Sequence, residues 1–346
     1  MNVTIKDVAR VAGVSVASVS RALNGNDNVT NATRQRIVSV AAHLRYMPNS
    51  AARSLITRRT HAIGVVLPDL HGEFFSELIR GMDCAARARG LHLLVSSAHG
   101  SQRETIEVLR ALCGRVDGLL VMSPDTDASF LAEHLPLSLP TVLMNMRSDH
   151  RFPSLSIDNY GGARTMTRHL FDCGYRRIAF VAGPALNFDA DERLRGYRDA
   201  LASFGPGMPA LVLPGDFSED SGYRAVSRLQ TGKRMPDAIF AANDMMAFGC
   251  LSALGERGFR VPDDIGLAGF DDVPIARFIA PPLTTMRVRI ADLGEAALER
   301  LAAQLEAPAQ PEPAQAPVSC ELVVRTSCRQ RLRLASVAAG SLVDAK

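Results

Sequence analysis

Apolar positions recur with helical spacing through the first forty-five residues. Residues 5–12 place apolar side chains at i, i+3, i+4 and i+7, which predicts a first helix that ends at Gly13. Residues 16–23 predict a second helix, and Thr30 begins a third with its own apolar stripe. Three short helices with a glycine-containing turn between the first two predict a helix-turn-helix head over residues 1–45.

A proline separates this head from the remainder of the chain. Pro48 blocks continuation of the third helix, and Asn49 can cap a short new helix over residues 50–55. A helix this short is not stable in isolation. We therefore expect residues 46–60 to be a hinge, whose helix forms when it packs against its twin from a second subunit and against DNA.

From residue 61 onward, buried strands alternate with amphipathic helices such as residues 75–89, 102–113 and 161–173. The apolar runs that predict strands are residues 63–67, 92–95, 118–122, 141–144, 178–181, 238–241 and 265–268. Continuous apolar strands imply parallel sheets covered on both faces. Two such series, which meet near residue 158, predict a bilobal α/β body over residues 61–330. Ligands of such sheets bind at the carboxyl ends of the strands, here in the cleft between the lobes.

The end of the chain has a different composition. Residues 306–317 are rich in proline, which predicts a connector. Residues 331–346 contain no sustained heptad. We expect them to be a disordered tail, and we expect a dimer rather than a tetramer assembled through the tail.

Charge is distributed unevenly along the chain. Of its 39 basic and 36 acidic residues, residues 1–60 hold nine basic and two acidic ones, a local net charge of +7 against −4 for the remainder. This asymmetry is typical of a phosphate-binding module joined to a nearly neutral sensor. The sequence has no apolar run long enough to cross a membrane and no apparent secretion signal, so we expect a cytoplasmic protein.

The sequence lacks the patterns of common catalytic and metal sites. No GxxxxGK[ST], HExxH, GxSxG or GxGxxG motif is present. The six cysteines form no CxxC pair and have no histidine cluster nearby at metal-ligand spacing. We expect reduced, buried thiols, no metal, no cofactor and no enzymatic activity.

The head resembles the lactose/galactose repressor (LacI/GalR) family. The matching segments are residues 4–9 (TIKDVA), 12–15 (AGVS), 19–24 (VSRALN) and 45–49 (RYMPN). The body is similar to the same family and to its periplasmic sugar-binding relatives. Its matching segments are residues 68–69 (PD), 74–75 (FF), 174–179 (GYRRIA), 193–197 (RLRGY), 242–244 (AND), 269–272 (GFDD) and 281–285 (PPLTT). Together these segments extend the resemblance over nearly all of residues 3–328.

Motif geometry and the resemblance together predict the DNA contacts. The second helix of a helix-turn-helix enters the major groove with its first residues near base edges. Arg21 can donate two parallel hydrogen bonds to guanine O6 and N7, whereas Val16 and Ala17 can only read shape or contact a thymine methyl group. The resemblance implies that the hinge helix lies in the minor groove, where Leu55 wedges into the central base step. The predicted DNA-binding residues are Thr4, Ser15, Val16, Ala17, Ser18, Ser20, Arg21, Asn24, Thr33, Asn49, Ala52 and Leu55.

In the body, the resemblance implies a small effector in the cleft. Carboxylate, amide and guanidinium groups bind hydroxyls, and aromatic rings pack on the apolar faces of a sugar. The predicted effector-binding residues are Phe74, Asn145, Asp189, Arg193, Phe217, Asn243 and Asp271. Asn187 lies in the region where purine-binding members have an arginine, and no cluster of Lys or Arg marks a phosphate pocket. A neutral sugar is therefore favoured over a purine.

The sequence thus predicts a homodimeric repressor that a sugar releases from a pseudo-palindromic operator with a central CG step. Several alternatives stay open at this point. Arg193 and Asp271 could form a structural ion pair, either phenylalanine could belong to the core, and Leu55 could pack only against the body. The effector could act as a corepressor. A doubly wound enzyme, a cytoplasmic sugar-binding protein and an exported sugar receptor are the alternatives from other functional classes.

Overall fold

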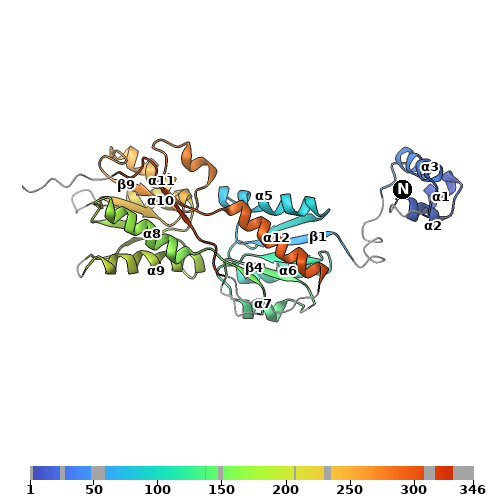
Figure 1. Ribbon diagram of the computed structural model, residues 1–346, viewed down its shortest axis with the longest axis horizontal. Coiled ribbons are helices and arrows are strands. Elements are labelled where there is room, and N and C mark those ends of the chain that lie inside the picture. Colours follow the sequence, from blue (N-terminus) through green and yellow to red (C-terminus); the bar gives the residue numbers. More distant parts are fainter. Residues whose placement is uncertain are drawn as a thin grey trace, which may run out of the picture. The chain divides into compact units, whose positions relative to one another are not determined.

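The computed structural model describes residues 3–23, 28–47, 59–136, 138–146, 151–205, 208–229, 235–307 and 316–329. The chain divides into two compact units, Met1–Thr60 and His61–Lys346. Within the described residues, the first unit contains helices and no strand, and the second contains parallel sheets (Figure 1). We call them the head and the body.

The head is built from three helices that share one small core. They are α1 (Ile5–Ala12), α2 (Val16–Leu23) and α3 (Asn31–His43). Gly13 ends α1 in the left-handed conformation, with φ of 64°, which a glycine adopts without steric cost. Val8, Val19 and Ile37, one from each helix, are fully buried against one another. The three helices predicted from apolar spacing are confirmed.

The first lobe of the body contains a five-stranded parallel sheet in the order β2-β1-β3-β4-β5. Its strands are β1 (Ala62–Leu67), β2 (His92–Ser97), β3 (Gly118–Val121), β4 (Thr141–Met144) and β5 (Ser154–Leu155). Its helices are α5 (Glu73–Ala88), α6 (Gln102–Leu112), α7 (Ala128–His134) and α12 (Ile290–Glu306). Alternate side chains of β1 enter two different cores, Val65 beside Leu78 of α5 and Val66 beside Leu109 of α6, so helices cover both faces.

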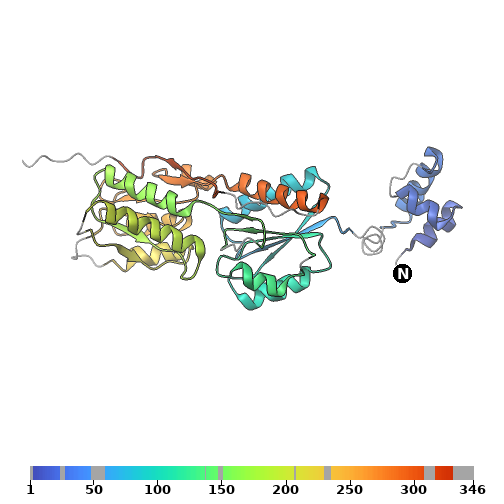
Figure 2. The ribbon, with the colours of Figure 1, turned by 60° about the horizontal axis from the view of Figure 1, so that its bottom comes forward.

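The second lobe contains a four-stranded parallel sheet in the order β7-β6-β8-β9. Its strands are β6 (Ile178–Val181), β7 (Leu211–Leu213), β8 (Ala238–Ala241) and β9 (Gly266–Ala268). Its helices are α8 (Asn159–Asp172), α9 (Phe188–Ser203), α10 (Glu219–Ser227), α11 (Asp244–Glu256) and the short 3-10 helix η1 (Pro274–Arg277). Helices α8 and α9 lie side by side on the outside of this sheet (Figure 2).

The lobes are not consecutive pieces of chain. After β9, the strand β10 (Thr285–Arg287) leads back to the first lobe, where α12 packs on α5, β3 and β4 (Figure 1). A Cβ at Gly81 of α5 would lie 1.9 Å from the carbonyl oxygen of Ala291, so glycine permits the two helices to approach this closely. The chain then returns through β11 (Glu321–Val323), which pairs antiparallel with β10.

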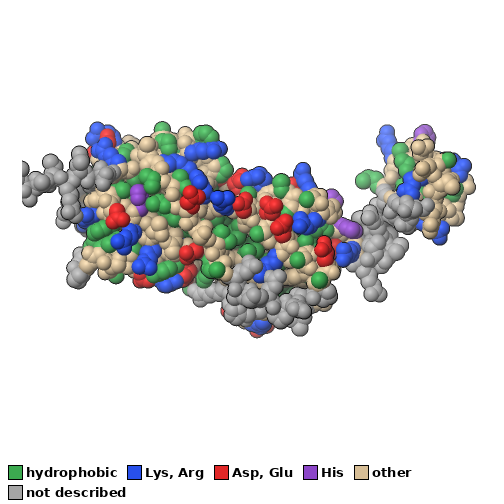
Figure 3. All heavy atoms as spheres, in the orientation of Figure 1, with side chains coloured by type: hydrophobic (Ala, Val, Ile, Leu, Met, Phe, Trp, Pro, Cys, Tyr) green, Lys and Arg blue, Asp and Glu red, His purple; other side chains and the backbone are tan. Residues whose placement is uncertain are grey.

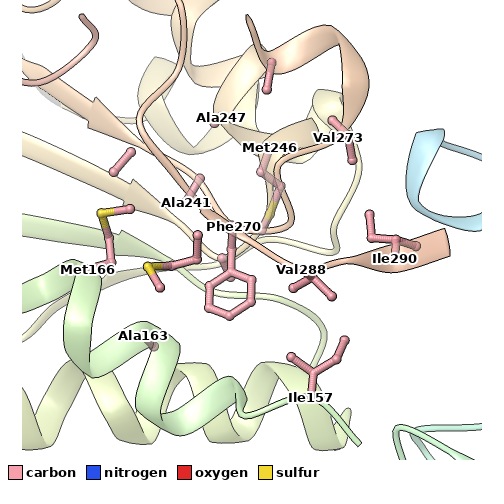
Figure 4. Packing of buried hydrophobic residues seen from close by; sticks show 14 of the residues in the cluster. Ile157, Ala163, Met166, Ala241, Met246, Ala247, Phe270, Val273, Val288 and Ile290 are labelled. Carbon is pink, nitrogen blue, oxygen red and sulfur yellow. The ribbon is translucent and has the colours of Figure 1, made fainter. Parts of the chain in front are cut away.

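The body's core continues from the second lobe into these connections. Phe270, which follows β9, is fully buried and packs over α8, where a Cβ at Gly162 would lie 2.8 Å from its ring (Figure 4). Val288, between β10 and α12, and Ile290, the first residue of α12, belong to the same cluster (Figure 4). The connections therefore share one packed core with Phe270, which directly precedes Asp271.

Several sequence expectations need correction. Strand β2 was expected to be buried on both faces, but it is the edge strand, and His92 and Leu94 are exposed. Strands β5, β7 and β10 were not among the expected strands, although the apolar run that contains β7 is as long as the one at residues 92–95. All six cysteines have free thiols, but only Cys250 and Cys328 are buried, so the expectation of buried thiols is wrong for the other four.

Candidate functional sites

A cavity of about 370 Å³ lies between the two lobes of the body. Segments that follow β1, β2 and β3 line it from the first lobe, and segments that follow β6, β7, β8 and β9 line it from the second. Both parallel sheets thus direct their carboxyl ends toward it, where side chains project from loops and a ligand can approach. The cavity is the body's candidate ligand site.

A buried polar network forms the floor of the cavity. Arg193 donates from Nε to Asn159 Oδ1 at 2.7 Å and from Nη1 to the Ala242 carbonyl at 2.6 Å. Its Nη2 lies 3.2 Å from Asp271 Oδ1, and both side chains are about 95% buried. Asn159 Nδ2 donates to Asp189 Oδ1 at 2.7 Å. Arg193, Asp189 and Asp271 all line the cavity, so the sequence-predicted charged residues are brought together.

The backbone of Asp271 is held in an unusual conformation. Its φ is 111°, a region that residues other than glycine rarely adopt. Its N–H donates to the Met286 carbonyl at 2.8 Å, and its carbonyl accepts from Val288 N at 3.1 Å. The connection between the lobes therefore fixes the direction in which this carboxylate points.

Burial changes the acidity of the two carboxyl groups. It raises the pKa of Asp189 to about 7, with the opposing charge of Arg193 lowering it and the charge of Asp271 raising it further. Burial raises the pKa of Asp271 to about 6, again against the charge of Arg193. Both groups therefore titrate near neutral pH, where they can exchange between hydrogen-bond donor and acceptor forms.

Asp189 should make the body's stability depend on pH. Its folded-state pKa lies above the ordinary value of 3.8, so the stability it contributes is complete below that value and is lost as pH rises through about 7. Between pH 5 and pH 8 the melting temperature of the wild type should fall further than that of Asp189→Asn. Thermal unfolding followed by circular dichroism measures the difference. Asp83→Asn, which removes an exposed carboxylate on α5, should show the same dependence of melting temperature on pH as the wild type. If the melting temperature of Asp189→Asn falls with pH as steeply as that of the wild type, Asp189 is not the group responsible.

Aromatic rings supply the apolar part of the cavity wall. Phe74 and Phe75 contact each other edge to face, with ring centroids 5.5 Å apart, and both line the cavity from the first lobe. Phe217 lines it from the second lobe. A Cβ at Gly183 would lie 2.5 Å from the Phe217 ring, so a glycine makes room for it.

The two predicted amides are placed differently from the charged residues. Asn243 lines the cavity, but its Oδ1 accepts from Met246 N at 2.9 Å and its Nδ2 donates to the Phe217 carbonyl at 3.0 Å. Asn243 therefore fixes the backbone of Phe217 and caps the N-terminus of α11. Asn145 is completely buried and is not one of the residues that line the cavity. Its Oδ1 accepts a hydrogen bond from Ile157 N at 3.2 Å, and its side chain lowers the pKa of Asp189.

Sequence reasoning missed most of the polar rim. The additional polar residues that line the cavity are Asp69, His71, His99, Asp125, Asn187, Asp216, Ser218 and Glu219. Each follows a strand, which is the signal that could have identified it, but loops carry no periodicity that says which side chains turn inward. Asn159, which connects Arg193 to Asp189, was missed because it lies at the first position of α8.

In the head, α2 presents one side to the core and the other to solvent. Val19 and Ala22 are buried, whereas Val16, Ala17 and Arg21 are exposed on the opposite side. Ser15 precedes the helix, where its Oγ accepts from Ser18 N at 3.1 Å. Among the residues predicted for the DNA contact, Thr4 and Thr33 hydrogen-bond within helix starts, Thr4 to Asp7 and Thr33 to Thr30.

The remaining predicted contacts, Asn24, Asn49, Ala52 and Leu55, lie outside the described residues. The exposed face of α2, with Arg21 in its last turn, has the dimensions and donors required to enter a major groove.

Comparison with known proteins identifies the family. Residues 4–49 match the family described as bacterial regulatory proteins of the lacI family, and residues 167–328 match the periplasmic binding protein-like domain. Catabolite control protein A of Priestia megaterium is 34% identical over 305 residues, which are 87% of this chain and 92% of that protein. The chain belongs to the LacI family. The ribose operon repressor of Escherichia coli (strain K12) is 35% identical to this LacI-family chain over 310 residues, 88% of this chain and 94% of that repressor.

The fold of this LacI-family regulator is also that of a solved relative. The Lac repressor dimer bound to operator and the anti-inducer ONPF matches it with a TM-score of 0.83 at 27% identity, covering 95% of this chain and 100% of that one. The predicted fold class, a helix-turn-helix head with a bilobal α/β body, is confirmed, as is the prediction of a DNA-binding transcription regulator. The named relatives are regulators rather than enzymes.

The described residues of this LacI-family regulator include no helix long and apolar enough to span a membrane. On the face of the body drawn in Figure 3, basic and acidic side chains are interspersed. No group of three or more potential metal ligands occurs in the described part of the chain.

Proposed function

We propose that this protein is a homodimeric repressor of carbohydrate-utilisation genes, released from its operator when a small neutral sugar binds the cavity of the body. The observation that carries the proposal is the composition of that cavity. Two carboxylates and one guanidinium converge on its floor, and aromatic rings line its walls. The ribose operon repressor and the Lac repressor bound to operator are relatives whose names agree with such a role.

Hydroxyl groups suit the floor of the cavity because they both donate and accept hydrogen bonds. Asp189 and Asp271 can accept from two hydroxyls, and Arg193 retains N–H groups beyond those bonded within the protein. Phe74 and Phe217 offer flat apolar surfaces to the C–H faces of a sugar ring. Asn243 acts on this set by positioning Phe217, and Asn145 lies outside the lining.

A phosphorylated sugar is a poor match for the same cavity. Phosphate groups are bound by several cationic donors. Arg193 is the one lysine or arginine among the described lining residues, and it already faces Asp271. The lining carboxyl groups are Asp69, Asp125, Asp189, Asp216, Glu219 and Asp271.

The head supplies the DNA contact. In each subunit, α2 enters the major groove with Val16, Ala17, Ser20 and Arg21 at the bases, while Thr4, Ser15, Ser18, Asn24 and Thr33 approach phosphates. Two hinge segments, with Asn49, Ala52 and Leu55, meet in the minor groove at a central CG step. The protein works without catalysis, metal or cofactor, in the cytoplasm where its operator lies.

Release of a fluorescent operator by sugars tests this function. Purified full-length protein should bind a pseudo-palindromic duplex with a central CG step in preference to a scrambled duplex, as measured by anisotropy. At least one neutral sugar from a panel should weaken that binding by about tenfold, a typical coupling between two sites. The corresponding sugar 6-phosphate should have no effect at the same concentration.

Three outcomes decide the matter. Equal affinity for both duplexes would refute the operator assignment. Tighter binding on addition of a sugar would make the sugar a corepressor. A response to the phosphorylated sugar alone would refute the proposed ligand class.

A further inference from the structure

Direct bonds join the two lobes at the mouth of the cavity. Ile275 N, in η1 of the second lobe, donates to Glu73 Oε2 of the first lobe at 3.0 Å, although the two residues are 202 positions apart. Phe188 N, at the start of α9, donates to the Pro124 carbonyl at 3.0 Å. Both bonds join protein groups directly, with no ligand atom between the donor and the acceptor.

The Glu73 bond connects two walls of the cavity. Glu73 is the first residue of α5, and the next two residues, Phe74 and Phe75, line the cavity. On the other side, Ile275 lies four positions after Asp271, which is part of the floor. Val273, between them, donates from N to Asp244 Oδ2 at 3.0 Å, so this segment is fixed to the second lobe.

The chemistry of this bond favours a real contribution to closure. Amides at the start of a helix lack partners within it, and a carboxylate is a strong acceptor for them. A second side-chain pair, His71 Nε2 and Glu219 Oε2, also joins the lobes, but these atoms are 3.7 Å apart and the side chains are 74% and 39% exposed. Exposed pairs of this kind contribute little. The Glu73 bond is also solvent-exposed, but it is shorter and its donor is a backbone amide at a helix start, so Glu73 makes the stronger of these two contacts between the lobes.

We propose that Glu73 and the Phe188 N–H form a closure clamp, two ligand-independent hydrogen bonds that hold the cleft shut, and that Glu73 transmits closure to α5. The inference rests on the proposed function for its consequence at the operator, but the clamp itself does not. Helix α5 packs tightly on α12, and β1, the strand before α5, is the first element after the head. A sugar that contacts Phe74 and Asp271 acts on both sides of the clamp, so it adds to a closure that the protein already favours.

Variants of Glu73 test the clamp in the full-length protein. Glu73→Asp keeps a negative charge in the first turn of α5, where it favours the helix, but its carboxylate is one methylene further from Ile275 N. Glu73→Ala removes both features. In either variant, hydrogen exchange at the Ile275 amide should be about tenfold faster, the effect of losing one hydrogen bond to a charged group. Glu77→Ala, one turn along α5, removes a carboxylate that pairs with Arg80 instead, and it should exchange as the wild type does.

A proline tests the second bond of the clamp. Phe188 is the first residue of α9, a position that tolerates proline, and Asn187 before it has φ of −83° and ψ of 122°, the extended conformation that a following proline prefers. Phe188→Pro therefore removes the N–H while keeping the helix. Phe188→Ala removes the ring and keeps the N–H. The radius of gyration in small-angle scattering should rise for the proline variant beyond that of the alanine variant.

Operator binding then tests transmission through α5. If closure disfavours DNA, Glu73→Ala without sugar should bind the pseudo-palindromic duplex about fivefold more tightly than the wild type, and Glu77→Ala should not. Exchange at Ile275 that is as slow in Glu73→Asp as in the wild type would refute the clamp. Faster exchange with unchanged operator affinity would refute transmission. If exchange at Ile275 is faster in the Glu73 variants but the wild type does not bind the pseudo-palindromic duplex, the clamp is supported and the proposed function is refuted.

Discussion

Arg193→Ala should unfold the body at a temperature roughly 10 °C below that of the wild type, because it leaves two buried carboxyl groups without their cation. Arg193 is 3% exposed and contacts Asn159, Ala242 and Asp271. Removing one member of a buried ion pair typically costs about 3–5 kcal/mol. Differential scanning calorimetry of the full-length chain measures the loss, and sugar release of the operator should disappear with it.

Two further variants separate charge from packing in this experiment. Arg195→Ala, on the same helix, removes an exposed arginine that pairs with Glu192, and it should cost about 1 kcal/mol or less. Arg193→Met combined with Asp271→Asn removes both charges and should recover part of the stability lost in Arg193→Ala. If Arg193→Ala melts like Arg195→Ala, the network on the cavity floor does not stabilise the body in the way its burial predicts.

Arg21→Ala should weaken operator binding by about 1–3 kcal/mol and flatten the base preference at one symmetric pair of positions. Arg21 is exposed on α2, opposite the buried Val19 and Ala22, so its removal leaves the core of the head intact. Selection of bound duplexes from a randomised pool, followed by anisotropy on the selected sequences, measures both effects.

Arg10→Ala is the matched control for this substitution. Arg10 is an exposed arginine on α1 whose Nη2 lies 2.7 Å from Asp7 Oδ1. Its loss removes the same formal charge from the head, so it should lower affinity for every duplex equally and leave the base preference unchanged. An unaltered base preference in Arg21→Ala would show that Arg21 does not read a base.

The shared wall of the cavity explains how one ligand can affect both lobes. Asp271 is directed by its backbone bonds to Met286 and Val288, which belong to the connection between the lobes. A ligand bound to Asp271 therefore contacts a residue whose backbone is hydrogen-bonded to the connection between the lobes. The bond between Glu73 and Ile275 also connects the segment that follows β9 and Asp271 to the first residue of α5.

The sequence by itself determined the elements and several members of the site. Runs such as residues 178–181 and 238–241 form strands because a continuous apolar segment can be satisfied only inside a covered sheet. Gly13 ends α1 because it adopts a positive φ without strain. Asp271 was identifiable at a strand end, and Arg193 was identifiable from the resemblance of residues 193–197.

Tertiary structure alone decided how these elements were used. Helix α12 returns to the first lobe, and β2 becomes an edge, because sheet order depends on pairing between distant segments rather than on local periodicity. The Nδ2 of Asn243 donates to the Phe217 carbonyl, 26 positions away, which only the folded loops bring within reach. Glu73 looks like an ordinary first-turn acid in sequence, and it joins two lobes because the fold places an amide from 202 residues away beside it. Local patterns are set by neighbours along the chain, whereas the bonds that define the site and its closure depend on where distant segments meet.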